Sequence, residues 1–413
     1  MAVLVALVGC SDVLAVGFRN EPIPITVEQR VPIARVSFES GETVKAAIDT
    51  LSPFTVVSSF VADDQPYPTE GAERTGVLKL FEDQPVCNGT DCKEVTRFIF
   101  ADHRSYDLRV ERVGRDSGVA VRALLGYAVM IRFAVQLRYA NDAGTLTFRD
   151  ELPDTDDELA ADCDTSEVLA GNYAPCVAVV RSGLLGGGDA SIGDNVRTLP
   201  PTRIVVPLCL NPDTFDPKSA TPSDVNTSGQ GTSAAIYSGI GTSIIGRAAF
   251  ERLRTRFPSL TETPGTTLHL PAGTVTASTT TIPRLAIVND RTTDLGPCEE
   301  LARRRRLLMA PRDGVLADKD QDQDGAAAAE LSGGIEFLVV EDDTLLLSGL
   351  RTELRPSSAD VDVLLAGSAL ERFDVDLDYP GGRWVFGCSL LHTDTCRVLP
   401  ACQQSGGAGP SCR

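Results

Sequence analysis

Short apolar runs separated by turn-forming residues make up most of this chain. Val, Ile, Leu and Phe cluster in short stretches that Gly, Pro, Asn or Asp usually bound. Such runs are typical of β-strands. Helical spacing is rare, and its clearest case places Ile245, Ala249 and Leu253 at intervals of four, with Phe250 and Phe257 alongside. The pattern predicts a mainly β protein with a helix near residues 245–257.

Two segments repeat one pattern at an offset of 240 residues, with Phe133 aligned to Phe373. The first runs from Ala123 to Phe148 and the second from Val363 to Phe386. In both, a Leu-Leu pair is followed by an Arg-Phe pair, an alternating strand, a Gly-containing turn and a final strand. Alternation puts the apolar side chains of each strand on one sheet face. The repeat predicts two homologous β lobes.

Composition divides the chain into six segments, and its 413 residues suffice for two cores. We assign residues 1–10 to a signal-like run ending at Cys10, 11–30 to a tether, 31–150 to a first lobe, 151–175 to an acidic linker, 176–388 to a second lobe and 389–413 to a Gly/Cys-rich tail. The linker is inferred from an acidic run between Asp150 and Glu167.

One stretch, Val44 to Val57, reads VKAAIDTLSPFTVV and interrupts an apolar run with Asp49-Thr50. It resembles the catalytic turn of aspartic peptidases, hydrophobic-hydrophobic-Asp-Thr-Gly-Ser/Thr, with Leu51 in place of glycine. A later hydrophobic-hydrophobic-Gly at Leu124–Gly126, followed by the repeated segment, resembles the rest of one lobe. The chain is therefore similar to the bilobal, pepsin-like peptidases, and the resemblance implies two β-barrel-like lobes with a cleft between them.

In that family each lobe donates one aspartate, and the two carboxylates share a proton so that one acts as base and the other as acid. The resemblance implies that Asp49 is a candidate catalytic acid, with Thr50 and Ser52 as supporting hydroxyls. Gly126 matches the family's supporting glycine. Leu51 would crowd the partner loop or project into the cleft, because glycine is what permits close backbone approach.

The second lobe offers a loop without an acid. The sequence AAIYSGIGTSIIG contains Gly241, Thr242 and Ser243, which match the Gly-Thr-Ser of the family motif. This register puts Gly239 where the second catalytic aspartate belongs. No Asp or Glu lies between residues 234 and 249. The second acid is therefore expected to be missing.

These features predict an exported aspartic-peptidase-like protein that is catalytically inactive and binds peptide or protein in the inter-lobe cleft. One alternative is an active aspartic endopeptidase that uses Asp49 with an unrecognised second acid. Another is a structural surface lipoprotein.

Charge and cysteines bear on partners and compartment. A net charge of −19 argues against nucleic acid. Leu7-Val8-Gly9-Cys10 resembles a bacterial lipobox. The resemblance implies a lipid on Cys10 that anchors the protein to a membrane, in the periplasm or at the cell surface. The alternative is a buried strand with a core cysteine. Ten of the eleven cysteines would then remain, and Cys87 with Cys92 is the best local disulfide pair.

Metal and cofactor motifs are weak. DKDQDQDG, from Asp318 to Gly325, resembles a calcium loop, but an EF-hand that began at Asp320 would have Leu331 instead of glutamate at its twelfth position. A solvated acidic loop is the other interpretation. The cysteine and histidine spacings do not suit zinc, and we expect neither a metal nor a cofactor.

Overall fold

The structure is a computed structural model of the full chain. It describes residues 22–38, 43–53, 55–58, 73–76, 78–81, 84–85, 96–101, 109–110, 119–131, 133–149, 152, 177–192, 195–199, 201–212, 229–270, 273–288, 296–302, 328–355, 360–392 and 394–399.

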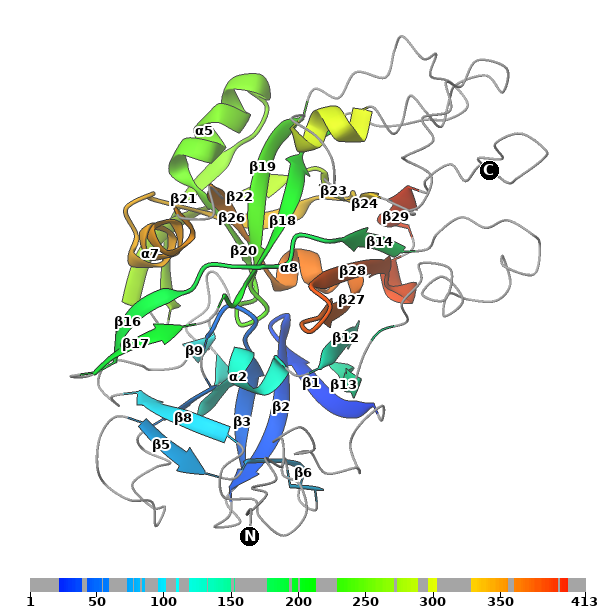
Figure 1. Ribbon diagram of the computed structural model, residues 1–413. Coiled ribbons are helices and arrows are strands. Elements are labelled where there is room, and N and C mark those ends of the chain that lie inside the picture. The colour runs from blue at the N-terminus through cyan, green and yellow to red at the C-terminus, as the bar shows by residue number, and fades with distance from the viewer. Residues whose placement is uncertain are drawn as a thin grey trace, which may run out of the picture.

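A 14-stranded sheet contains strands from both halves of the chain (Figure 1). Its main path runs in the order β14 (Val177–Val180), β28 (Arg383–Cys388), β27 (Phe373–Asp378), β12 (Ala134–Ala140), β13 (Ala143–Arg149), β1 (Ile23–Glu28), β2 (Val31–Phe38), β3 (Thr43–Ile48), β11 (Ala123–Leu125), β4 (Thr55–Ser58), β8 (Thr96–Ala101) and β5 (Glu73–Gly76). Off this path, β6 (Leu78–Phe81) pairs with β2 and with β7 (Gln84–Pro85).

An 11-stranded sheet belongs to the second half. Its main path runs in the order β21 (Glu262–Leu270), β22 (Gly273–Ile282), β25 (Ile335–Val340), β20 (Ser243–Gly246), β26 (Val361–Leu365), β19 (Gln230–Ile236), β18 (Arg203–Leu210), β23 (Leu285–Val288), β24 (Ala328–Leu331) and β29 (Cys396–Leu399), and β15 (Leu184–Leu185) pairs with β18. Two small sheets pair β9 (Arg109–Val110) with β10 (Val119–Ala120) and β16 (Gly188–Ile192) with β17 (Asn195–Leu199).

The two halves meet where β12 pairs antiparallel with β27. Val135 lies opposite Leu377, and Leu137 lies opposite Val375. The repeat offset of 240 maps Val135 onto Val375 and Leu137 onto Leu377. Exchanging the halves therefore leaves this pairing unchanged, as an approximate twofold axis requires. The predicted fold class, mainly β with two homologous lobes, is confirmed.

The short helices follow the same symmetry, since α2 (Tyr127–Met130) and α8 (Gly367–Leu370) differ by the same offset of 240. The second half also contains α7 (Leu345–Leu354) and the short 3-10 helix η2 (Leu390–His392).

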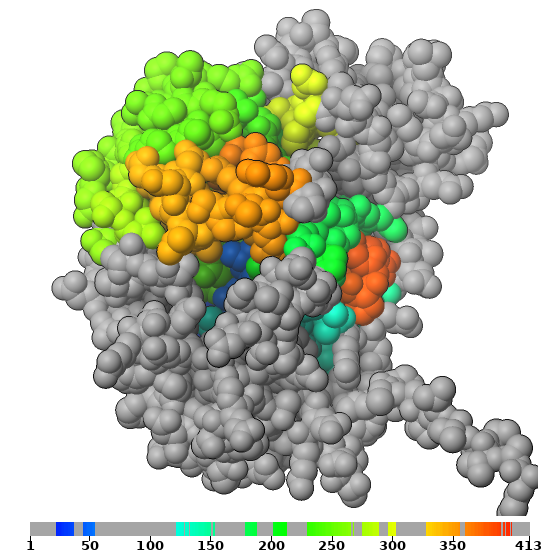
Figure 2. Space-filling model, turned by 60° about the vertical axis from the view of Figure 1, so that its left-hand side comes forward, coloured from blue at the N-terminus to red at the C-terminus, as the bar shows by residue number. Residues whose placement is uncertain are grey.

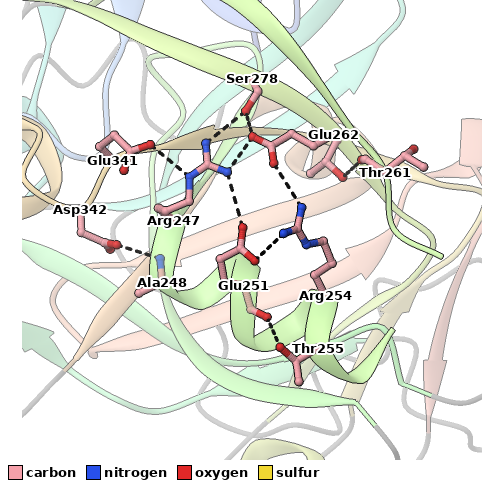
Figure 3. A network of polar contacts seen from close by, with 11 residues as sticks. Arg247, Ala248, Glu251, Arg254, Thr255, Thr261, Glu262, Ser278, Glu341 and Asp342 are labelled. Carbon is pink, nitrogen blue, oxygen red and sulfur yellow. Dashed lines mark hydrogen bonds and ion pairs between the residues drawn. The ribbon is translucent and has the colours of Figure 1, made fainter. Parts of the chain in front are cut away.

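Helix α5 (Arg247–Arg256) forms where helical spacing predicted it and buries Ala249, Phe250 and Leu253. A polar network ties its outer face to the neighbouring strands (Figure 3). Arg247 lies 2.6 Å from Glu262 and 3.1 Å from Glu341. These contacts hold α5 against β21 and the end of β25.

Two expected segment boundaries differ from the structure. The tether, 11–30, contains β1, in which Ile23, Ile25 and Val27 are buried and alternate with more exposed residues. That alternation is a strand signal, and the strand pairs with both β2 and β13. The tail, 389–413, contains β29, which pairs with β24. Both segments therefore contribute strands to the fold.

Two disulfides join described cysteines, Cys209–Cys298 and Cys388–Cys396. The first joins cysteines 89 positions apart and the second joins cysteines 8 positions apart. The expectations for Cys10, for Cys87 with Cys92 and for the acidic loop at 318–325 fall outside the described residues, as does the linker 151–175 except for Leu152.

No helix in the described part of the chain is long and apolar enough to span a membrane. Within the same residues, no group of three or more His, Cys, Asp and Glu side chains is arranged so that it could hold a metal ion.

Candidate functional site

Asp49 stands at the end of β3, in a loop that its own side chain organises. Its Oδ1 accepts hydrogen bonds from the backbone N–H of Leu51, at 2.9 Å, and of Ser52, at 3.0 Å. An aspartate that bonds to the backbone two and three residues ahead is a common way to build a tight turn. Only 3% of Asp49 is exposed. The turn therefore fixes a carboxyl group inside the protein.

Reciprocal hydrogen bonds join this loop to its counterpart in the second half. Thr50 Oγ1 donates to the carbonyl of Ile236 at 2.8 Å, and Ser238 Oγ donates to the carbonyl of Ile48 at 2.5 Å. The backbone N–H of Ser238 donates to Thr50 Oγ1 at 3.1 Å, and that of Thr50 donates to Ser238 Oγ at 3.2 Å. Thr50 and Ser238 are thus symmetry equivalents, each of which holds the opposite loop.

Tyr237, and not Gly239, stands at the position equivalent to Asp49. The backbone N–H of Asp49 donates to the carbonyl of Leu125 at 2.9 Å, and that of Tyr237 donates to the carbonyl of Leu365 at 2.8 Å. Leu125 and Leu365 are themselves equivalent in the repeat. The predicted register is therefore wrong by two residues.

The correct register sets the two loops at an offset of 188 residues. Gly239 then aligns with Leu51, as the glycine of the family motif would, and Ser243 aligns with Thr55. Gly241 and Thr242 lie between Gly239 and Ser243, before β20, and do not match the residues of the family's catalytic motif. The Gly-Thr-Ser match that selected the earlier register is a chance identity.

Gly239 still contacts Asp49, because its loop packs directly against the first. A Cβ at Gly239 would lie 2.7 Å from Asp49 Cγ and 2.9 Å from Tyr237 Cε2. Real Cβ atoms do not approach other atoms so closely, so glycine permits the contact. Gly239 thus lies beside the carboxyl group without supplying an acid.

Leu51 does not project into a cleft. It is 8% exposed and packs into a second-half cluster that includes Tyr237 and Ile240. Its carbonyl accepts a hydrogen bond from Arg203, whose guanidinium is held by Glu353 at 2.6 Å. The residue that replaces the family glycine therefore joins the two halves.

The turn between β1 and β2 also docks on the second half. Gln29 and Arg30 have left-handed φ angles of 51° and 68°. The turn lies against the backbone of Gly241 and Gly367, where a Cβ would collide with it. Arg30 pairs with glutamates of the second half. These are Glu336 at 2.9 Å and Glu371 at 3.1 Å.

Gly126 and Ala366 occupy equivalent positions before α2 and α8. Gly126 has φ −101° and ψ −167°, and Ala366 has φ −127° and ψ −167°. Both are extended conformations that any residue can adopt. The backbone N–H of Ala366 donates to Ser243 Oγ at 3.0 Å. Alanine in place of the family glycine is therefore tolerated.

Burial dominates the electrostatics of Asp49. It raises the pKa of the carboxyl from 3.8 to about 6, against the opposing effects of the Leu51 and Ser52 N–H groups and of Arg203. Arg203 is the one charged side chain of the described residues that shifts this pKa. Burial also raises the pKa of Tyr237 well above 10, and the charge of Asp49 adds to this effect.

A hollow opens on the face shown in Figure 2. Orange residues around α7 and green residues after β14 border it, and blue residues from the first strands are visible at its floor. Residues from the first strands therefore lie at the floor of a surface hollow that second-half residues border.

Comparisons with known proteins give one kind of match. No family model matches the sequence, and no curated protein matches it. Among solved structures, an aspartic proteinase from Irpex lacteus aligns with 90% of this chain and 98% of its own, at 12% identity and a TM-score of 0.38. The fold is mainly β, with two large mixed sheets and two halves related by an approximate twofold axis, which is consistent with a bilobal pepsin-like fold.

The second loop contains Tyr237, the residue that the sequence interpretation missed. Family chemistry needs two carboxylates that share a proton. Here Asp49 faces a phenol, Tyr237, which stays neutral and can donate but cannot serve as the second carboxylate. A signal for this register existed: Ala46-Ala47-Ile48 repeats as Ala234-Ala235-Ile236 immediately before the two positions.

Proposed function

We propose that this chain is a non-catalytic, aspartic-peptidase-like protein that holds an extended peptide or protein segment in the hollow between its halves. Tyr237 at the position equivalent to Asp49 is the observation that carries the proposal. A lone carboxylate lacks the partner that protonates the substrate while the other activates water.

The packing of the loops supports the same conclusion. Tyr237 is 3% exposed and its ring lies in a cluster with Leu51. This cluster occupies the side of Asp49 on which a second acid would lie. Strand-like peptide segments are a common ligand of exposed grooves in β proteins, because their backbone groups need partners.

Hydrolysis tests the non-catalytic half of the proposal. Unfolded casein is incubated with the protein between pH 3 and pH 7, with and without pepstatin, and fragments are counted by mass spectrometry. The expected result is no cleavage that depends on Asp49, so that the wild type and Asp49→Ala give the same fragments. Pepstatin-sensitive cleavage that disappears in Asp49→Ala would establish the active endopeptidase instead.

Equilibrium binding tests the other half. The probe is a fluorescent pool of decapeptides randomised over uncharged residues, followed by polarisation. Saturable binding is expected. Its absence would leave a structural surface role as the better explanation.

We further propose that the protein is exported and anchored by a lipid on Cys10. Two disulfides between described cysteines support an oxidising compartment. Membrane fractionation of cells that express the wild type or Cys10→Ser tests the anchor. The wild type should sediment with membranes and the variant should not; equal distribution of the two would refute lipidation at Cys10.

A further inference from the structure

Asp49 has one carboxylate oxygen that the described residues leave unbonded. Oδ1 accepts both loop N–H groups, from Leu51 and Ser52. Among the described residues no group donates to Oδ2. This oxygen faces Gly239, where a Cβ would lie 3.0 Å away. Within the described part of the chain, Oδ2 therefore has no hydrogen-bond donor.

The charges around Asp49 do not balance. Arg203 is the neighbouring cation, but Glu353 holds its Nη2 at 2.6 Å and its Nε at 2.9 Å, and its Nη1 donates to the Leu51 carbonyl. Counted over the residues that the structure describes, two carboxylates and one guanidinium leave one negative charge uncompensated. An ionised group in a desolvated site is costly unless a partner of opposite charge neutralises it.

Where the chain is described, the other titratable groups that feel the charge of Asp49 are phenols. Tyr237 and Tyr379 both feel its charge, and burial raises the pKa of each above its ordinary value. Tyr127 packs edge-on against Tyr379 with ring centroids 5.8 Å apart, and burial raises its pKa as well. These groups are neutral at ordinary pH and cannot supply the missing positive charge.

We infer that the ligand of this site carries a cationic group of the lysine or alkylamine class, which pairs with Asp49 Oδ2. The inference rests on the proposed function and names the chemistry of its ligand. An ammonium group supplies the donors that Oδ2 lacks and the charge that the site lacks. The net charge of −19 favours the approach of such ligands.

The sign of the pH dependence separates this ligand from a neutral one. A cation needs the ionised carboxylate, so its affinity increases as the pH rises through the Asp49 transition. A neutral peptide that accepts a hydrogen bond from the protonated acid would bind better at lower pH. Burial places that transition, the pKa of Asp49, at about 6.

Two fluorescent decapeptide pools provide the test. Both have uncharged residues randomised around a fixed centre, which is lysine in one pool and acetyl-lysine in the other. Dissociation constants are measured by polarisation at pH 5.0 and 7.5. At pH 7.5 the lysine pool should bind about tenfold more tightly, the order expected for a charge-assisted hydrogen bond in a buried site. At pH 5.0 the difference should largely disappear.

Two variants make the test specific. Asp49→Asn keeps an oxygen for the loop N–H groups but removes the charge, so it should bind both pools equally at pH 7.5. Asp360→Asn is the control, because it removes the charge of an exposed carboxylate, and it should keep the preference for the lysine pool. Far-ultraviolet circular dichroism checks that both variants are folded, and the wild-type pH comparison needs no variant.

Each outcome has one meaning. The cation inference is overturned, and peptide binding is left intact, if the wild type binds both pools equally at pH 7.5. The same holds if it binds the lysine pool more tightly at pH 5.0 than at pH 7.5. If Asp49→Asn still prefers the lysine pool, the preference comes from surface charge, and the inference is overturned. Binding of neither pool overturns the proposed function together with the inference.

Discussion

Asp49→Asn should make the protein more stable at neutral pH, although it removes a residue from the candidate site. The fold raises the pKa of this carboxyl from 3.8 to about 6, so the folded state prefers the protonated form. Its contribution to stability is therefore fully present only below the unfolded pKa of 3.8, and is lost as the pH rises from there through about 6. Asparagine resembles the protonated acid and should not lose that contribution.

The pKa difference sets the magnitude. A shift of about two pKa units corresponds to about 3 kcal/mol, at 1.36 kcal/mol per unit. Asp49 is only 3% exposed, so solvent screening does little to reduce this figure. Asparagine Oδ1 can still accept from Leu51 and Ser52, so the turn itself should persist.

Urea unfolding at several pH values measures the effect. The fluorescence of Trp384, the single tryptophan and a fully buried residue of β28, reports on the shared sheet. The free energy of unfolding of Asp49→Asn should exceed that of the wild type by about 3 kcal/mol at pH 7.5 and should equal it near pH 4. Asp360→Asn, which alters an exposed carboxylate, should change the free energy of unfolding at pH 7.5 by under about 0.5 kcal/mol.

This reasoning would be refuted if the free energies of unfolding of Asp49→Asn and of the wild type differed by the same amount at pH 4 and at pH 7.5. It would mean that the carboxyl ionises equally easily in the folded and unfolded chain, and hence that its environment is not desolvated.

Two further substitutions probe the loops. Gly239→Ala should lower the free energy of unfolding by about 1–3 kcal/mol through overpacking, since a Cβ there would meet neighbouring side chains at 2.7 and 2.9 Å. Gly296→Ala is the control, because nothing lies within 4 Å of a Cβ there, and it should leave the thermal midpoint almost unchanged. Equal effects of the two substitutions would contradict the close contact between the loops. Glu353→Gln should cost about 3 kcal/mol in urea unfolding, because it leaves Arg203 buried without its partner. Glu341→Gln, whose side chain is 62% exposed, should cost under about 1 kcal/mol, and a comparable loss in both would contradict the burial argument.

The fold could be predicted because alternation and repetition are properties of the sequence itself. Val135 and Leu137 alternate as sheet residues must, and their repeat at Val375 and Leu377 is the pairing that joins the halves. The first loop was found for the same reason, since Asp49 interrupts an apolar strand in a recognisable way.

The second loop could not be placed by motif alone. Gly-Thr-Ser is short enough to occur by chance, and aligning on it placed the second loop in a register that is wrong by two residues. The backbone hydrogen bonds of Tyr237 and Ser238 decide the register, and these depend on the neighbouring strand at Leu365. An alignment of the apolar residues before each loop would have found it.

Tertiary partners explain the remaining errors. Ile23, Ile25 and Val27 alternate, but a six-residue strand at the start of a chain is recognisable only once β13 and β2 are there to pair with it. The Arg203–Glu353 pair spans 150 residues and leaves no local signal.

The central claim is that Asp49 ionises alone, opposite a tyrosine. The ¹³C chemical shift of its carboxyl carbon, assigned by comparison with Asp49→Asn in protein labelled at aspartate, tests this claim most directly when it is followed from pH 3 to pH 9. The account predicts one transition with a pKa of about 6. Two coupled transitions, as carboxylates that share a proton would give, would contradict it.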